Sequence, residues 1–105
     1  MAEGYINIPK NGWTSYETLH TETYGALYGC INPQIGIGYI AWAGNNNTSI
    51  SGLLSIAVPN NYKPINNFLV ILRNGDNMEI RADGTVRLAL TGQSWSGASA
   101  VYPLA

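Results

Sequence analysis

The sequence predicts an all-β domain, a small antiparallel β-barrel or jelly roll of about eight short strands. Three observations predict it: short alternating apolar runs, turn signals between them, and no sustained helical periodicity. The composition agrees, because the chain has 12 Gly and seven Tyr among 105 residues. Glycine supplies turns and tyrosine favours strands. This length fits one domain, 1–105, in which residues 1–12 are either part of the head or the end of a stem or linker.

Four strands are predicted before residue 60. Residues 14–23 lack a sustained apolar stripe, so we expect them to be extended or irregular rather than helical. Two of the strands pair as a hairpin across Asn32-Pro33-Gln34. In the second arm of this hairpin, strand alternation separates a face with Ile35, Ile37, Tyr39 and Ala41 from a face with Gly36, Gly38, Ile40 and Trp42. The strands span residues 5–8, 26–31, 35–43 and 50–58.

The second half of the chain predicts strands at 68–73, 78–82, 85–90 and 100–102. The first of these is nearly all apolar, as expected of a strand covered on both faces. Asn74-Gly75 and Asp83-Gly84 are hairpin signals. In the two strands that follow them, alternation points Met78, Ile80, Ala82, Val86, Leu88 and Leu90 inward, and Glu79, Arg81 and Arg87 outward.

The charge balance argues against two classes of partner. Five basic and six acidic side chains give a formal net charge of −1. Nucleic-acid binders show basic stripes, and a membrane-spanning helix needs roughly 18 apolar residues in a row. The chain has neither, so we expect no nucleic acid and no membrane insertion. Low charge also disfavours a soluble small monomer, so we expect a homo-oligomer that buries one face against copies of itself.

Enzymatic signatures are missing from the sequence. No serine stands in a nucleophile elbow, and there is no phosphate-binding loop, dinucleotide fingerprint or zinc spacing. We therefore expect a protein that is not an enzyme and that uses no cofactor and no metal. Cys30 is the single cysteine, which allows no intrachain disulfide, and we expect it to be a small packed side chain in a strand.

The order of features in the second half is more specific than any one of them. It runs from Val58-Pro59-Asn60-x-Tyr62-x-Pro64 through an apolar strand, Asn74-Gly75 and Asp83-Gly84-Thr85-Val86 to Tyr102-Pro103 near the end. This order resembles the C-terminal head domain of receptor-binding proteins from phage tail tips and baseplates, as in lactococcal siphophages. The resemblance covers about the last half of the chain, and the first half only in the rhythm of its strands.

The resemblance implies a homotrimeric head on a virion tail tip or baseplate, exposed outside the host cell. It implies binding of bacterial cell-wall saccharide by non-covalent contacts, and attachment to other tail or baseplate proteins through an N-terminal stem. The start of the chain shows no secretion signal, which agrees with release by lysis. The family presents a His-x-Asp pair on the strand after the first hairpin. Here Glu79 and Arg81 stand at those positions, so the polar pair is kept in place and changed in type.

A saccharide site needs an aromatic face for the sugar ring and planar polar groups for its hydroxyls. The candidate residues are Trp42 and Trp95 for the ring, and Asp76, Glu79, Arg81 and His20 for the hydroxyls. Trp13 and Tyr62 are expected to be structural, with Trp13 in the core.

Each candidate also has an ordinary explanation. Glu79 and Arg81 fit a solvated strand face with cross-strand charge partners. Trp42 fits a trimer interface, and Trp95 fits a loop anchor. Asp76 fits a turn and His20 a surface or interface position. The alternative function is a trimeric structural or assembly module of a virion fibre or baseplate that binds no ligand. The trimeric jelly roll of the C1q and tumour-necrosis-factor kind is another architectural relative.

Overall fold

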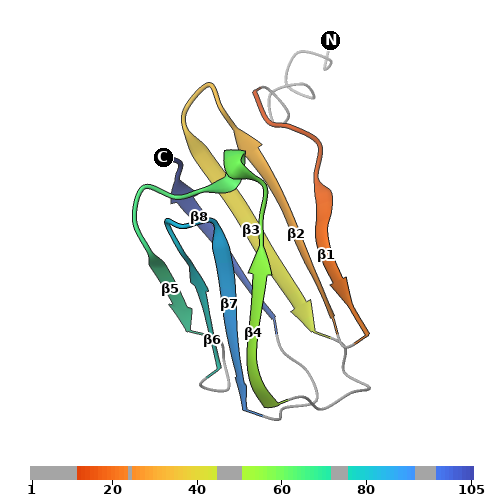
Figure 1. The fold of residues 1–105 in the computed structure, drawn as a ribbon. Helices are drawn as coiled ribbons and strands as arrows, with labels where there is room; N and C mark the ends of the chain where they lie inside the picture. Colours follow the sequence, from red (N-terminus) through yellow and green to blue (C-terminus); the bar gives the residue numbers. More distant parts are fainter. Residues whose placement is uncertain (1–11, 24, 45–50, 72–75, 92–96) are drawn as a thin grey trace.

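The computed structural model describes residues 12–23, 25–44, 51–71, 76–91 and 97–105. These residues form two four-stranded antiparallel sheets that face each other (Figure 1). Sheet A has the strand order β1-β2-β3-β8, with β1 (Glu17–Glu22), β2 (Gly25–Asn32), β3 (Ile37–Gly44) and β8 (Gly97–Pro103). Sheet B has the order β4-β7-β6-β5, with β4 (Ser51–Ala57), β5 (Phe68–Ile71), β6 (Asn77–Ile80) and β7 (Thr85–Thr91). The all-β prediction is confirmed.

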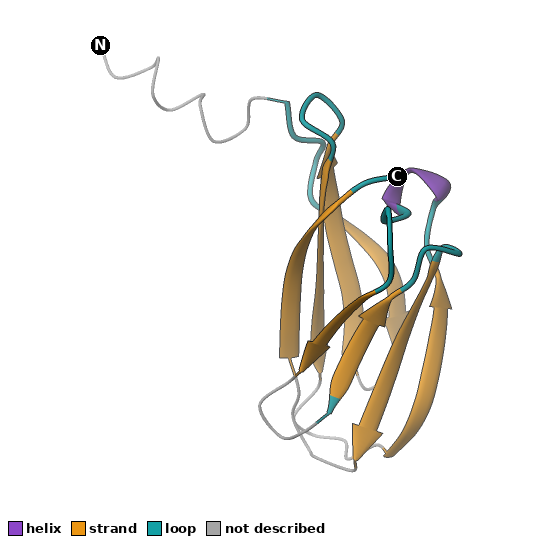
Figure 2. Ribbon diagram, turned by 90° about the vertical axis from the view of Figure 1, so that its left-hand side faces the viewer, coloured by secondary structure: helices purple, strands orange, loops and turns teal. Residues whose placement is uncertain are grey.

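The strand connections make each sheet from one meander and one distant strand. In sheet B, β5, β6 and β7 follow one another, and the earlier β4 pairs with β7, which is a Greek-key order. In sheet A, β8 returns from sheet B to pair with β3. Among the described residues the strand ladders stay within the two sheets and close no barrel. The arrangement is therefore a two-layer sandwich, as the side view also shows (Figure 2).

The β2–β3 hairpin forms where the sequence predicts it. Its register runs without a break from Gly25 opposite Gly44 to Asn32 opposite Ile37. A turn at 33–36 connects the arms, and Gly36 takes a φ of +71° there, which side-chain-bearing residues rarely adopt. Ile35 was expected in the strand, but it lies in this turn and is 63% exposed. The strand begins two residues later because the turn needs four residues to reverse the chain.

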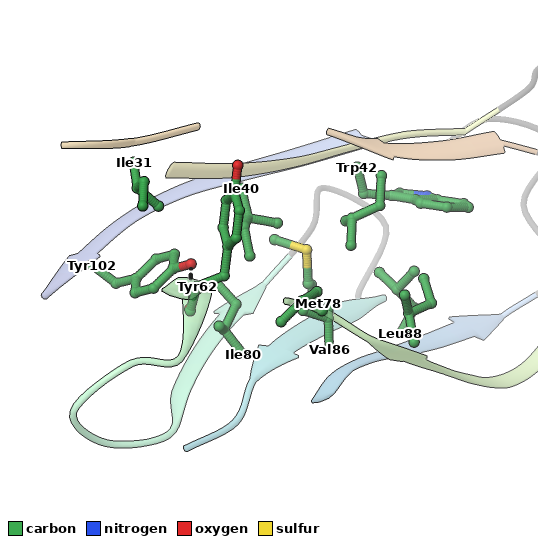
Figure 3. Packing of buried hydrophobic residues seen from close by; sticks show 12 residues of the cluster. Ile31, Ile40, Trp42, Tyr62, Met78, Ile80, Val86, Leu88 and Tyr102 are labelled. Atoms are coloured by element: carbon green, nitrogen blue, oxygen red, sulfur yellow. Dashed lines mark hydrogen bonds between the residues drawn. The ribbon is translucent and has the colours of Figure 1, made fainter. Parts of the chain in front are cut away.

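The hydrophobic core fills the space between the two sheets (Figure 3). It takes alternate residues from both, as expected for two packed sheets. Trp42 is one of them and is only 2% exposed, so the expected exposure of its ring is wrong. Gly25 on β2 leaves room for the indole, because a Cβ there would lie 2.5 Å from Trp42 Cζ2. The core residues are Leu27, Ile31, Ile40, Trp42, Ile56, Val58, Tyr62, Met78, Ile80, Val86, Leu88 and Tyr102.

Two buried tyrosines tie the β4–β5 connection to sheet A. Tyr62 follows β4 in a short 3-10 turn, η2 (Asn60–Tyr62), and its hydroxyl donates to Glu17 Oε2 at 2.9 Å. The Tyr102 hydroxyl donates to the Tyr62 carbonyl oxygen at 2.8 Å (Figure 3). Burial raises the pKa of both phenols, because the charged phenolate is poorly solvated there. Gly38 makes room for the Tyr102 ring, since a Cβ at Gly38 would lie 2.7 Å from Tyr102 Cζ.

Sheet B confirms some of the predicted orientations and corrects others. Met78 and Ile80 point inward, as do Val86 and Leu88. The prediction that residues 68–73 are covered on both faces is wrong, because β5 is an edge strand whose Leu69 and Ile71 are 61% and 66% exposed. A two-layer sandwich covers only one face of each sheet. Ala82 was expected inward but is exposed, in the turn before β7.

Two predicted features of the first half have different outcomes. Residues 14–23 were expected to be extended or irregular, and β1 confirms an extended segment there. The predicted strand at 5–8 lies outside the described residues. In the second half of the chain, the hairpin signal Asn74-Gly75 also lies outside them.

Candidate functional site

The outer face of sheet A carries a cluster of aromatic side chains. Tyr28 on β2 and Tyr39 on β3 alternate with inward Leu27 and Ile40, so both phenols point away from the core. Tyr16 precedes β1 and is 58% exposed. Its ring stacks on Tyr28, with centroids 5.6 Å apart and planes 15° apart. It also lies 6.2 Å from the Tyr39 ring at a tilt of 42°.

The Tyr16 and Tyr39 rings border an open groove of about 620 Å³. Cys30, Tyr39 and Val101 stand in one row across β2, β3 and β8, because Tyr39 is in register with both of the others. The segment before β1 forms a wall beside this row. The groove is lined by Trp13, Thr14, Ser15, Tyr16, Cys30, Tyr39 and Val101.

Two hydrogen bonds between Thr14 and Ile31 hold the wall against β2. Thr14 N–H donates to the Ile31 carbonyl at 2.8 Å, and Ile31 N–H donates to Thr14 Oγ1 at 3.0 Å. Trp13 stands next to this anchor and is half-buried in the groove wall rather than in the core, which corrects its expected place. The wall is therefore positioned by sheet A, although it lies outside the strands.

The described residues that line the groove are uncharged. Burial, together with the nearby Tyr39 and Tyr28, raises the pKa of the Tyr16 phenol. Burial also raises the pKa of the Cys30 thiol. Both groups therefore keep their protons near neutral pH, and the thiol is a poor nucleophile in this state. The lining offers aromatic faces and neutral hydroxyls, which suit non-covalent binding of a polyhydroxylated ligand.

Glu79 and Arg81 lie on the other sheet. Arg81 Nη1 donates to Glu79 Oε1 at 2.7 Å, and Arg81 Nε lies 3.7 Å from Asp83 Oδ2. The bond to Glu79 is the main cause that raises the pKa of Arg81. Hydrogen bonds from Thr85 lower the pKa of Asp83. These groups are engaged with one another, on the outer face of sheet B and in the turn between β6 and β7.

The other sequence candidates do not join Glu79 and Arg81. Trp42 is in the core. Asp76 lies in the β5–β6 connection, just before β6, and is 1% exposed, which corrects its expected role as a contact for sugar hydroxyls. His20 is half-buried on β1, where its Nε2 contacts Glu22 Oε2. Trp95 lies outside the described residues. The structure therefore does not gather these candidates into one site.

The groove residues were missed for a specific reason. Alternation correctly separates Tyr39 from Trp42, but the sequence does not say which side of β3 is covered. The predicted hairpin already placed Tyr28 and Tyr39 on neighbouring strands, which was a usable signal. Trp13 and Tyr16 belong to an irregular segment with no periodic pattern, and nothing local indicates that they reach this face.

Two further features, a metal-binding cluster and a membrane-crossing helix, are absent from the described residues. They contain no cluster of three or more His, Cys, Asp or Glu side chains placed to hold a metal ion. Within the same residues, no helix has the length and hydropathy to cross a membrane.

Comparisons of the chain with protein-family models, curated proteins and solved structures find no match. The sandwich and its aromatic groove are thus the observations on which a function is argued.

Proposed function

We propose that the protein is a phage receptor-binding head that recognises saccharide on the host cell surface through the groove on sheet A. The exposed Tyr16 ring, stacked on Tyr28 at the border of an open groove, carries the proposal. Aromatic faces pack against the apolar faces of sugar rings, and neutral hydroxyls bond the sugar hydroxyls. Such contacts need no covalent step.

The phage assignment is supported by the order of motifs from Val58-Pro59 to Tyr102-Pro103 and by the antiparallel all-β architecture. In this proposal the site moves from Glu79 and Arg81 to the sheet A groove. The reason is that Glu79 and Arg81 already pair with each other at 2.7 Å, whereas the hydroxyls in the groove wall border open space.

The proposal includes a homotrimer on a virion tail tip or baseplate, attached through an N-terminal stem. Low overall charge supports association between copies, and so do Leu53, Leu69 and Ile71, which are exposed on the outer face of sheet B. A shallow polar site binds weakly by itself. Several heads on one particle raise the avidity by orders of magnitude, about 10²–10⁴ for linked sites.

A calorimetric titration of the protein with Gram-positive cell-wall polysaccharide tests the proposal. We expect saturable binding, loss of at least about tenfold in affinity for Tyr16→Ala, and no change for Asn61→Ala in the exposed η2 turn. Both variants replace an exposed side chain, so neither should unfold the protein. Light scattering on the same samples should give a mass near three chains. Equal binding by Tyr16→Ala and the unaltered protein would remove the groove from the proposal.

The second candidate is a trimeric structural module of a virion fibre or baseplate. The apolar outer edge of sheet B favours it, since Leu69 and Ile71 on β5 are more than half exposed. This module would bind no polysaccharide, and Leu69→Asp would dissociate the trimer. Saturable binding that depends on Tyr16 would exclude this candidate.

A further inference from the structure

We infer that the groove on sheet A takes a neutral glycan, and not a polymer that carries phosphate or carboxylate groups. This inference rests on the proposed function and names the class of saccharide that the same site accepts. The charged side chains of the described residues lie outside this groove.

Of the residues that the structure describes, seven line the groove, and none of these seven carries an acidic or basic side chain. Their polar groups are hydroxyls from Thr14, Ser15, Tyr16 and Tyr39, together with the Cys30 thiol. A hydroxyl is both a donor and an acceptor, so this lining matches the hydroxyls of a sugar without a preference for charge.

The nearest charged residue in the sequence is turned elsewhere. Glu17 follows Tyr16 directly, but its carboxylate accepts the bond from the Tyr62 hydroxyl, which enters from the core side of sheet A. Glu22 and His20 pair toward the other end of β1. Neither carboxylate of β1 is therefore free to line the groove.

The remaining described charges belong to other parts of the molecule. Glu79 and Arg87 lie on β6 and β7 of sheet B. Arg81 and Asp83 lie in the turn between these strands, and the buried Asp76 lies just before β6. Lys63 lies in the β4–β5 connection, where a Cβ on Gly84 would meet its side chain at 2.9 Å. Among the described residues, the charged side chains outside β1 thus lie away from the aromatic groove of sheet A.

This separation selects against an anionic ligand. Proteins hold phosphate and carboxylate groups with arginine, lysine or the N-terminus of a helix, which supply charge-assisted hydrogen bonds. An anion taken from water without such a partner loses solvation that the site does not replace. A neutral hexose or N-acetylhexosamine loses no ionic solvation, and its apolar ring face is covered by the tyrosines.

A comparison of neutral and anionic polysaccharides tests the inference. Anion exchange separates one extract of Gram-positive cell-wall polysaccharide into a neutral and an anionic fraction. Each fraction is titrated into the unaltered protein, the Tyr16→Ala variant and the Asn61→Ala control, at low and at high salt. We expect the neutral fraction to bind, with an affinity that changes less than about twofold with salt, because no screened charge contributes. Tyr16→Ala should weaken this binding by at least about tenfold, and Asn61→Ala should leave it unchanged.

The possible failures are distinguishable. Tighter binding of the anionic fraction, weakened by salt and by Tyr16→Ala, would overturn the neutral class and keep the proposed function. Binding of neither fraction would overturn both. A lower molar mass for Tyr16→Ala in light scattering would show that a second copy of the chain occupies the groove, which also overturns both.

Discussion

The two outer faces of the sandwich come from the same alternation of inward and outward residues, yet they present different chemistry. The face of sheet A is aromatic and uncharged along its groove, with Tyr16, Tyr28 and Tyr39 in contact. The face of sheet B combines the Glu79–Arg81 pair with exposed aliphatic side chains on β5. Alternation decides only that a residue points outward. The contacts that an outward residue makes depend on which other segments of the chain reach the same surface.

The contacts on the two faces also differ in their range along the chain. Arg81 reaches Glu79 and Asp83, each two residues away, so the ion pairs of sheet B are local. Tyr16 reaches Tyr28 and Tyr39, which are 12 and 23 residues away by their positions in the chain. Local contacts survive small changes in packing, whereas the aromatic cluster exists only when β1, β2 and β3 are assembled.

The largest expected effect is a difference in folding stability between substitutions on the two sides of β3. Trp42→Ala should destabilise the protein by about 3–5 kcal/mol, because it leaves a cavity between the sheets. Tyr39→Ala, on the outer side of the same strand, should cost less than about 1 kcal/mol. Urea unfolding monitored by far-ultraviolet circular dichroism measures both. Equal losses would mean that the sheet does not separate an inner from an outer face as described.

A smaller effect is expected where sheet A makes room for a core ring. Gly38→Ala should cost about 1–3 kcal/mol, because the added methyl group would overlap Tyr102 Cζ. Ser99→Ala on the exposed side of β8 is the control, with a change below about 0.5 kcal/mol. The same unfolding experiment compares them. A neutral Gly38→Ala would show that Tyr102 packs elsewhere.

The core tyrosines should make the fold sensitive to alkali. Burial raises the pKa of Tyr62 and Tyr102 above the ordinary value of about 10, so the folded state holds these protons more tightly than the unfolded chain. Their contribution is fully present below about pH 10 and is lost as the pH rises toward the folded-state pKa. Melting temperatures should therefore fall above about pH 10.

Tyr62→Phe sharpens the alkaline experiment. It removes the hydrogen bond to Glu17 and should cost about 0.5–1.5 kcal/mol at neutral pH. The fall in melting temperature at high pH should become shallower, because one ionising group has been removed from the core. A slope identical to that of the unaltered protein would mean that Tyr62 does not titrate with unfolding.

The smallest effect is expected on sheet B. Arg81→Ala breaks the pair with Glu79, but both groups are about one third exposed, so the loss of stability should be the smallest of this series. Saccharide binding should not change, since Arg81 lies on the sheet opposite the groove. Calorimetric titration of the variant measures this. A large loss of binding would return the site to Glu79 and Arg81.

The sequence by itself determined the all-β class, the β2–β3 hairpin and the inward positions of Met78, Ile80, Val86 and Leu88. These follow from turn residues and from a side-chain period of two, which are local properties of the chain. Polar neighbours also mark the inner face of β6 and β7, because Glu79 and Arg87 alternate with the apolar positions.

Only the tertiary structure decided which face of β3 is buried. Both faces are largely apolar, and the alternation of side chains separates the two faces without indicating which one faces the core. Sheet B covers the side with Ile40 and Trp42, which leaves Tyr39 outside. The groove then depends on a non-periodic segment, Trp13 to Tyr16, that pairs with Ile31 from a distance along the chain. Burial and surface clusters are set by packing between remote segments, and no local pattern encodes that packing.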